Sequence, residues 1–543
     1  AGAAPAAQPP APAPAPGRPL AIRTPPPLAS LAEHPVVPAP ALVAPAAGAP
    51  FRLTAAARIV TPAGGTAAGA TAADSAALGV GRYLGTLLRP PTGFALPVAP
   101  ADGPAPRGAI ALRLDGPAAL GDEGYTLVVA TDSVRLAAYR PAGLFRGVQT
   151  LRQLLPAGVE APQFVMAPAT AWTVPAGRVE DRPRFAWRGG MLDVARHFFT
   201  VDEVKQYVDL LALYKLNVLH LHLSDDQGWR LEVDAWPRLA AVGGLTEVGG
   251  GPGGFYTKRD YTEIVRYAAE RFITVVPEID LPGHTQAAIA AYPALGCSRP
   301  MPDSAYSAAT APAPGLYTSI RVGFSALCPD SALTWRVVED VVRELAALTP
   351  GPYLHLGGDE VQALTPAQYA AFIERAQALV RRHGKTMIGW DEITRARLAP
   401  GTIAQVWRPD TSTAARRQGA RLILSPGPRT YLDMKPRADV ELGLRWAGFI
   451  EPRTTYDWDP AALVRGAGEA DVLGVEAPLW TETVPNITAA TYLLLPRLPA
   501  LAEVGWTAQD GRAWDDFRRR IAAHAPRWRW RGLNYYPSPQ VAW

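Results

Sequence analysis

The sequence predicts a (β/α)₈ barrel that follows a small α+β domain. Within residues 184–543, eight short apolar segments have the length and composition of buried strands, and helical patterns lie between several of them. Polar and aromatic residues follow nearly every segment, as at the carboxyl end of an α/β barrel. An open doubly wound sheet is the alternative, but no G-x-G-x-x-G opens any of the helices. The eight segments are 190–194, 218–223, 273–279, 353–356, 387–390, 403–407, 422–425 and 472–477.

Capping and periodicity place the helices of the barrel. Thr200 and Glu203 have the spacing of a capping box, and apolar residues recur on one face of the segment behind them. Segments 261–271 and 332–348 have the same amphipathic pattern. We therefore expect each of these segments to pack as a helix on the outside of the barrel.

Residues 34–183 have a different pattern, which predicts the α+β domain. Residues 107–116 alternate apolar and polar side chains like a half-buried strand. Two more strand candidates, 125–129 and 133–139, flank a turn, and segment 142–155 has the apolar stripe of a helix. The domain contains no recognisable cluster of catalytic side chains.

Residues 1–33 form an Ala- and Pro-rich tail. The first thirty residues contain ten Pro and ten Ala, and their only charges are Arg18 and Arg23. Such a segment buries too little surface to offset its ordering entropy, so we expect it to be disordered or polyproline-like. It is similar to the stem that often follows a cleaved signal peptide, with a linker as the alternative. We therefore expect an exported protein, secreted or periplasmic.

Composition excludes several classes of protein. The chain has 543 residues and a formal net charge of +4 without any block of basic residues, so nucleic acid is not an expected partner. No uninterrupted apolar run reaches the roughly 18 residues that a membrane span requires. The two cysteines form no C-x-x-C motif, which excludes a structural zinc or iron–sulfur site.

The residues after the predicted strands indicate sugar chemistry. Carboxylates hydrogen-bond hydroxyl groups and transfer protons, and indole faces stack on the apolar C–H faces of pyranose rings. A barrel filled only for stability would end its strands in Val, Ile and Leu. The residues that follow the strands include Asp193, Arg196, His197, Asp225, Asp226, Trp229, Glu278, Asp280, His284, Asp359, Glu360, Trp390, Asp391, Glu392, Trp407, Tyr431, Asp433, Trp480 and Glu482.

His220 and His222 leave a second interpretation open. Alternate strand residues share a face, so the two imidazoles could form a metal pair, as in a metal-dependent amidohydrolase. Asp225 has the opposite parity. With Asp225 facing the site, the histidines are expected to face the helix layer and to be packed side chains rather than ligands. The nearby carboxylates Glu278 and Asp280 are candidates for a structural pair that holds a histidine.

Several longer motifs resemble the β-N-acetylhexosaminidases of glycoside hydrolase family 20. They are HLHLSDDQGW at 220–229, PEIDLPGH at 277–284 and HLGGDE at 355–360, with GWDE at 389–392, WTE at 480–482 and RPAGLFRGVQTLRQLL at 140–155. The resemblance extends from about residue 35 to the C-terminus. It implies exo-acting hydrolysis of terminal β-linked N-acetylglucosamine, and possibly N-acetylgalactosamine, as in chitin degradation by an exported bacterial enzyme. It implies no metal and no other cofactor.

The resemblance also implies roles for individual residues. Glu360 would be the general acid and then the base, Asp359 would orient the acetamido N–H, and Tyr431 would hold the acetamido oxygen. The remaining residues would bind or enclose the sugar: Trp390, Trp407 and Trp480 as walls, Arg196, Asp433 and Glu482 on the hydroxyls, Asp225 and His284 behind the acid, and Trp446 at the rim.

Residue chemistry agrees with a reaction in which the substrate supplies the nucleophile. Successive strand residues point to opposite faces, so Asp359 and Glu360 are a poor pair for the two carboxyl groups, about 5–5.5 Å apart, of an ordinary retaining glycosidase. We expect the charge of Asp359 to help raise the pKa of Glu360. A conventional retaining enzyme with Glu482 as nucleophile and a non-catalytic sugar-binding protein are the alternatives.

Cys297 and Cys328 flank a Pro- and Ala-rich segment after the third predicted strand. Exported proteins with two cysteines usually pair them, and the resemblance suggests a disulfide at this place. The segment is longer than the resemblance leads us to expect, and it lies close to the mouth of the predicted site. The sequence therefore does not define which leaving groups the site accepts.

Overall fold

The computed structural model describes residues 27–63, 71–101, 103–166, 172–297, 315–408 and 412–543. Most of the predicted tail, residues 1–33, lies outside this part of the chain. Residues 31–33 form a short 3₁₀ turn, and Leu31 is fully buried in the core. The first described element therefore lies inside the predicted tail, just before residue 34.

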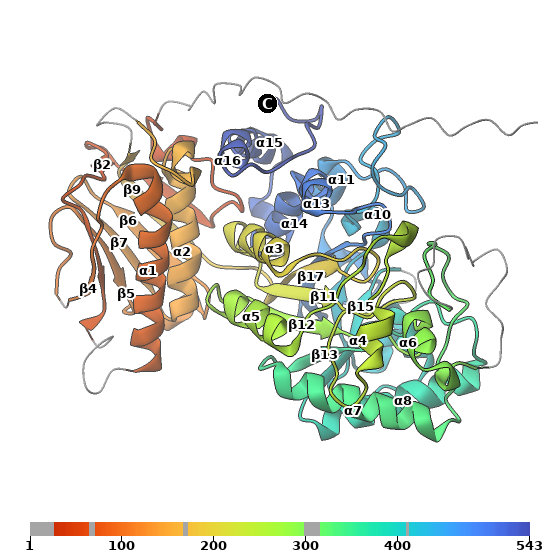
Figure 1. The fold of residues 1–543 in the computed structure, drawn as a ribbon. Coiled ribbons are helices and arrows are strands. Elements are labelled where there is room, and N and C mark those ends of the chain that lie inside the picture. Colours follow the sequence, from red (N-terminus) through yellow and green to blue (C-terminus); the bar gives the residue numbers. More distant parts are fainter. Residues whose placement is uncertain (1–26, 64–70, 102, 167–171, 298–314, 409–411) are drawn as a thin grey trace, which may run out of the picture.

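The N-terminal part is an α+β domain built on one seven-stranded sheet. The strand order is β1-β9-β6-β7-β5-β3-β4, and Figure 1 shows α1 and α2 side by side against one face of the sheet. A separate two-stranded sheet pairs β2 with β8. The bounds are β1 (Leu42–Pro45), β2 (Phe51–Arg52), β3 (Arg58–Thr61), α1 (Ala72–Thr92), β4 (Val98–Pro100), β5 (Ala109–Arg113), β6 (Tyr125–Val129), β7 (Ser133–Ala138), α2 (Pro141–Leu154), β8 (Thr173–Val174) and β9 (Gly177–Asp181).

The second part is a closed barrel of eight parallel strands, so the predicted fold class is confirmed. Each of the eight predicted segments overlaps one barrel strand. The capping box before α3 (Val201–Leu213) is also present, because Thr200 Oγ1 accepts from the Glu203 N–H at 3.3 Å. The strands are β10 (Trp187–Asp193), β11 (Val218–His222), β12 (Thr274–Glu278), β13 (Tyr353–His355), β14 (Thr386–Trp390), β15 (Ile403–Val406), β16 (Arg421–Leu424) and β17 (Val472–Leu479).

Helices surround the barrel. Figure 1 shows α5 and α3 on the side that faces the N-terminal domain, and α7 and α8 on the far side. No described helix is both long and apolar enough to cross a membrane. The helices after α3 are α4 (Arg238–Gly243), α5 (Lys258–Ala269), α6 (Gln286–Ala291), α7 (Ala332–Leu348), α8 (Pro366–Arg382), α9 (Ser412–Arg417), α10 (Gly427–Thr430), α11 (Pro452–Tyr456), α12 (Pro460–Leu463), α13 (Ile487–Leu494), α14 (Arg497–Trp506), α15 (Trp514–Ala522) and α16 (Ala525–Trp530).

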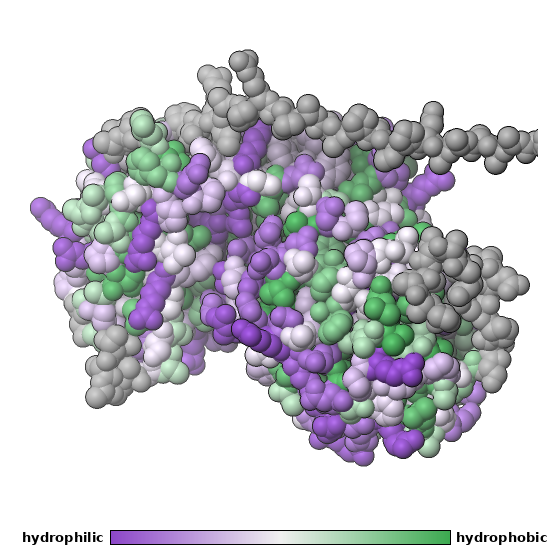
Figure 2. Space-filling model, in the orientation of Figure 1, coloured by the Kyte–Doolittle hydropathy of each residue, from purple (hydrophilic) through white to green (hydrophobic). Residues whose placement is uncertain are grey.

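A buried ion pair joins the two domains. Lys215, just after α3, contacts Asp181 at the end of β9 with 2.8 Å between Nζ and Oδ2, and both side chains are fully buried. The Trp506 indole donates to the other Asp181 oxygen at 2.8 Å. Figure 2 shows hydrophilic and hydrophobic residues interspersed over both lobes of the visible face. The N-terminal domain therefore rests on the barrel through specific buried polar contacts.

The expectation that His220 and His222 face the helix layer was wrong. Both side chains point into the barrel: the ring of His220 lies 4.5 Å from that of His355, and His222 contacts Asp225 directly. The parity argument failed because β11 ends at His222. Strand alternation therefore does not extend to Asp225, which lies in the following loop.

Candidate active site

A cavity of about 370 Å³ lies at the carboxyl ends of the barrel strands. It collects side chains from loops that are far apart in the sequence, which is the usual position of an active site in this fold. Most of the predicted site residues line it. The lining residues are Arg196, Ile320, Val322, Asp359, Glu360, Trp407, Tyr431, Leu444, Trp446, Trp480 and Glu482.

Asp359 and Glu360 both reach this cavity because the chain leaves regular strand geometry after β13. Gly357, Gly358 and Glu360 have positive φ angles of 61°, 98° and 50°. A Cβ on Gly357 would lie 1.8 Å from an oxygen of Asp280, so glycine is required there. The strained turn brings two successive carboxyl groups to one site, which the alternation of an extended strand would prevent.

The His284 ring lies between this pair of carboxyl groups and a third one, that of Asp225. Its Nε2 is 3.7 Å from Asp359 Oδ2 and 3.6 Å from Glu360 Oε2, while its Nδ1 donates to Asp225 Oδ1 at 3.0 Å. Burial alone would lower the pKa of His284, but the charges of Asp225, Asp280 and Asp359 raise it well above its usual range. The structure thus places His284 as an imidazolium beside Glu360. Asp225 and His284 are both buried behind the cavity lining.

The expected rise in the pKa of Glu360 was wrong for the site without substrate. Burial acts to raise that pKa, but the hydrogen bond and charge of His284 and the charge of Arg196 lower it below its usual value. The raised value falls on Asp359 instead, where burial and the charge of Glu360 bring the pKa to about 6. In the free site Asp359 therefore binds a proton at higher pH than Glu360 does.

Aromatic side chains form the walls of the cavity. The ring of Tyr431 lies 6.3 Å from Trp407 in a stacked arrangement and 5.5 Å from Trp446 edge-on. Trp480 packs 5.6 Å from Trp390, whose side chain is only 1% exposed and lies behind the cavity surface. Trp446 also lines the cavity, and it is 56% exposed.

Arg196 and Glu482 line the cavity, whereas Asp433 is buried outside its lining. Arg196 contacts Asp225 at 2.8 Å and lies over the Trp480 ring at 4.9 Å. Glu482 Oε2 and both carboxyl oxygens of Asp433 are buried, and the described residues supply no hydrogen-bond partner for them. Burial and mutual repulsion raise the pKa of Asp433, and burial raises that of Glu482. Such groups can both donate to and accept from hydroxyl groups.

Sequence reasoning missed Ile320 and Val322, which line the cavity from the crossover between β12 and α7. This segment has no periodic pattern, and its only sequence signal is its position between two cysteines. The structure pairs Cys297 with Cys328, with 4.7 Å between the Cα atoms. Much of the Pro- and Ala-rich segment between them, residues 298–314, lies outside the described residues.

The two histidines of β11 are bound to carboxylates. His220 lies 2.8 Å from Glu476 through Nδ1 and 3.0 Å from Glu278 through Nε2. His222 lies 2.5 Å from Glu278 through Nδ1 and 2.8 Å from Asp225 through Nε2. Four ring nitrogens each facing a carboxylate oxygen fit a buried hydrogen-bond network better than a metal pair.

A closed (β/α)₈ barrel with carboxylates and indoles around a cavity at its strand ends defines a sugar-processing enzyme, a glycoside hydrolase. Residues 185–368 and 363–509 match the family model for the glycosyl hydrolase family 20 catalytic domain, and residues 33–182 match that for domain 2 of the same family. The chain belongs to glycosyl hydrolase family 20.

Individual relatives agree over nearly the whole chain. A beta-N-acetylhexosaminidase of Cellulomonas fimi is 46% identical over 512 residues, which cover 94% of this chain and 97% of that protein. The structure of the Streptomyces plicatus N-acetyl-beta-hexosaminidase in complex with Thio-NAglucal superposes with a TM-score of 0.87 at 49% identity, covering 95% of this chain and 99% of that one. The family 20 enzyme of Streptomyces coelicolor A3(2) gives 0.85 at 50% identity, covering 94% and 99%.

Proposed function

We propose that Asp359, Glu360 and Tyr431 carry out the reaction of this β-N-acetylhexosaminidase, which hydrolyses a terminal, non-reducing β-linked N-acetylhexosamine. The main support is that the carboxyl groups of Asp359 and Glu360 both line the cavity. They lie 3.7 and 3.6 Å from the same nitrogen, His284 Nε2. Two adjacent groups on one side of the sugar supply an acid and a stabilising anion. They do not form the opposed pair of a conventional retaining enzyme.

The substrate supplies the nucleophile in the first step. The acetamido carbonyl oxygen attacks C1, the bond from C1 to the glycosidic oxygen breaks, and Glu360 donates its proton to that departing oxygen. The product is an oxazolinium ion, whose charge Asp359 stabilises while it accepts the acetamido N–H. In the second step Glu360 removes a proton from water and the water oxygen attacks C1. The bond from C1 to the acetamido oxygen breaks, which restores the acetamido group, and the sugar leaves with its original anomeric configuration.

Substrate binding places the proton where the first step needs it. In the free site Asp359 has the higher pKa of the two carboxyl groups. An acetamido N–H donates to the ionised form of Asp359 and so favours loss of its proton. The bound sugar also excludes water from Glu360, which favours the protonated form of that group. A sugar without the acetamido group cannot produce this exchange.

The charged side chains of the cavity define an exo-acting enzyme. Arg196, Asp433 and Glu482 take the hydroxyl groups of the terminal sugar, since their buried polar atoms have hydrogen-bonding capacity to spare. Arg196 offers a rigid fork of donors that can hold two oxygens at once. With these groups closing one end of the cavity, only a chain terminus can enter.

The biological substrate is an exposed oligosaccharide of the kind released from chitin, and the enzyme is exported. Support for export comes from the Cys297–Cys328 pair, because disulfides persist in oxidising compartments. Support for an oligosaccharide comes from the rim, where Trp446 and Ile320 are 56% and 43% exposed and can contact a second sugar ring. Detection of the active enzyme in the culture medium or periplasm of its host would test export.

A panel of aryl glycosides tests the function most directly. The panel contains the β-N-acetylglucosaminide, its O4-inverted N-acetylgalactosaminide and the plain β-glucoside. These compounds differ only at the acetamido group and at O4, which the site is proposed to recognise. We expect efficient turnover of at least the first compound and almost none of the last. Comparable turnover of the plain glucoside would contradict substrate assistance.

A further inference from the structure

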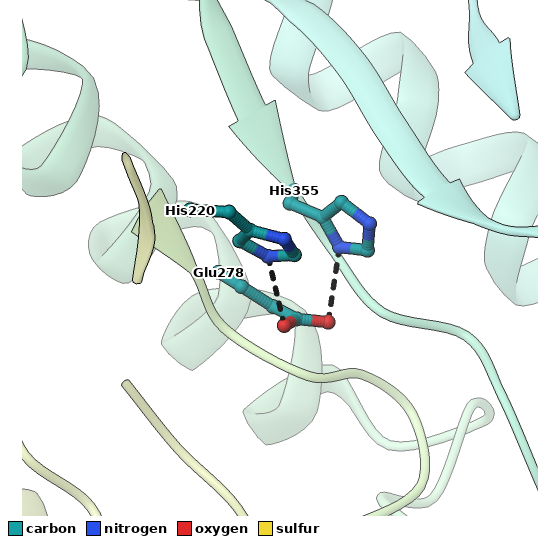
Figure 3. Close-up of side chains that lie close together, drawn as sticks. All are labelled: His220, Glu278 and His355. Carbon is teal, nitrogen blue, oxygen red and sulfur yellow. Dashed lines mark ion pairs between the residues drawn. The ribbon is translucent and has the colours of Figure 1, made fainter. Parts of the chain in front are cut away.

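Glu278, the last residue of β12, is a buried carboxylate at the centre of the barrel interior. It is fully buried and binds side chains from three other strands. Figure 3 shows its carboxylate between the imidazoles of His220 and His355, each 3.0 Å away. Two further side chains complete its surroundings: His222 Nδ1 at 2.5 Å from Oε2, and Trp390 Nε1, which donates to Oε1 at 2.9 Å.

The carboxylate is charged. Burial alone would raise the pKa of Glu278, but the imidazoles of His355, His222 and His220 lower it well below its usual range. The pKa of His222 is correspondingly raised: burial opposes the rise, and Glu278 and the hydrogen bond to Asp225 cause it. Glu278 and His222 therefore form a buried ion pair.

One group of contacts runs from Glu278 to the wall of the sugar cavity. The indole that it binds, Trp390, packs 5.6 Å from Trp480, and both belong to an apolar cluster with Tyr431. The N–H bond to Glu278 fixes the rotation of the Trp390 ring, because a buried indole N–H without a partner is unfavourable. The position of the wall thus depends on the carboxylate.

A second group of contacts runs from Glu278 to the proposed acid. His222 donates from Nδ1 to Glu278 and from Nε2 to Asp225 at 2.8 Å. Asp225 in turn accepts from His284 at 3.0 Å, and His284 Nε2 lies 3.6 Å from Glu360 Oε2. Hydrogen bonds thus connect Glu278 to His284, and a charge contact of 3.6 Å connects His284 to the acid.

We propose that Glu278 is a positioning residue for the hydrolytic reaction, through which one buried carboxylate orients both the cavity wall and the chain of groups behind the acid. The inference rests on the proposed roles of Asp359 and Glu360. Because Glu278 touches neither cavity nor substrate, it acts only through Trp390 and His222.

Glu278→Gln separates the two groups of contacts. The amide oxygen can still accept from the Trp390 indole. The amide nitrogen, however, is a donor, and it would lie opposite the His222 N–H, which is also a donor. His222 must then lose its proton or turn, and its bond to one neighbour is lost. Glu476→Gln is the matched control. Glu476 is equally buried and accepts from Trp187, His220 and Gln405, but it contacts neither Trp390 nor His222.

The experiment compares kcat and KM for N-acetylglucosaminides with activated and with poor leaving groups, together with pH profiles and thermal unfolding. For Glu278→Gln we expect kcat on the poor leaving group to fall on the order of 10–100-fold, as on loss of an outer supporting group. The loss on the activated substrate should be smaller, and the pH profile should shift. In a Glu360→Gln background the same substitution should add little loss on the poor leaving group.

Glu476→Gln should keep both the leaving-group dependence and the pH profile of the wild type. The inference would be overturned if the two variants behaved alike. In that case the loss of kcat would follow the fall in unfolding temperature and the pH profile would not shift. If Glu278→Gln does not fold, His222→Gln cuts the same chain while Glu278 keeps His220, His355 and Trp390. That variant must then show the leaving-group-dependent loss. Failure of the wild type to hydrolyse any N-acetylhexosaminide would refute the proposed function itself, which is a distinct result.

Discussion

The Nε2 atom of His284 lies 3.6 Å from the Oε2 atom of Glu360. This contact places a buried positive charge next to the proposed acid and holds the pKa of Glu360 below its usual value, although burial opposes that shift. A low pKa suits the second step, in which Glu360 must act as a base after giving up its proton. The first step therefore requires the substrate itself to supply the conditions under which Glu360 is protonated.

Replacing the acid should make the rate depend on the leaving group. Glu360→Gln removes the proton donor, so we expect kcat on a poor leaving group to fall by about 10²–10⁴-fold, the usual contribution of general acid catalysis. An activated aryl group departs without protonation and should lose much less. Steady-state kinetics on a series of aryl N-acetylglucosaminides measures this directly. Equal losses across the series would show that Glu360 is not the acid.

Replacing Asp359 should affect every leaving group alike. Asp359→Asn keeps a hydrogen-bond acceptor for the acetamido N–H but removes the charge that stabilises the oxazolinium ion. We expect kcat to fall on the order of 10²–10³-fold on activated and poor substrates, as when one preorganised electrostatic contact is lost. A loss confined to poor leaving groups would instead assign proton donation to Asp359.

The pKa of Asp359 predicts how the activity depends on pH. Burial and the charge of Glu360 raise this pKa to about 6, so the group is neutral below pH 6 and ionised above it. Only the ionised form stabilises the positive charge of the intermediate. We therefore expect kcat/KM for an activated substrate to fall as pH drops through about 6. The profile of Asp359→Asn should lack this step, and a step that persists in the variant would assign it to another group.

The fold and much of the site were predictable because barrel strands are short apolar runs that end in polar residues. That pattern located β13 and so Asp359 and Glu360. It could not show the positive φ of Glu360, which brings both carboxyl groups to one cavity. The alternation of side chains also gave the wrong orientation for His222. The strand ends at that residue, so the alternation does not extend to Asp225.

The parts that sequence reasoning missed depend on long-range contacts. The sequence made Glu278 a candidate for holding a histidine but could not identify its partners, which come from three other strands and become neighbours only when the barrel closes. In the N-terminal domain, helix α1 and the short strands β1, β3, β4 and β9 were not predicted. Strands of three to five residues offer too few alternations to be distinguished from loops.

The acetamido group itself provides a further test. If its oxygen is the nucleophile, a thiazoline analogue of N-acetylglucosamine should inhibit tightly, because it resembles the cyclic intermediate while resisting hydrolysis. The plain aryl β-glucoside should be nearly inert. Inhibition constants and turnover numbers measure both effects. Weak inhibition together with ready hydrolysis of the glucoside would indicate an enzymic nucleophile such as Glu482.

The disulfide that closes the crossover between β12 and α7 should make a modest contribution to stability. Cys297 and Cys328 are 31 positions apart and anchor the crossover that carries Ile320 and Val322 to the cavity. In the chain-entropy model a closed loop of this length stabilises a protein by about 3–4 kcal/mol. We expect a smaller effect, because a surface crossover can open locally while the barrel stays folded.

Thiol titration of the denatured, unreduced protein should therefore find no free thiol. The double variant Cys297→Ser/Cys328→Ser should remain folded and keep its kcat on a small aryl substrate, because neither sulfur belongs to the cavity lining. Its KM for an oligosaccharide should rise, since the segment that carries Ile320 is less firmly held beside the bound leaving group. Two free thiols in the denatured wild type would refute the disulfide and remove the main support for export. An unchanged KM in the double variant would show that the crossover keeps its position without the bridge.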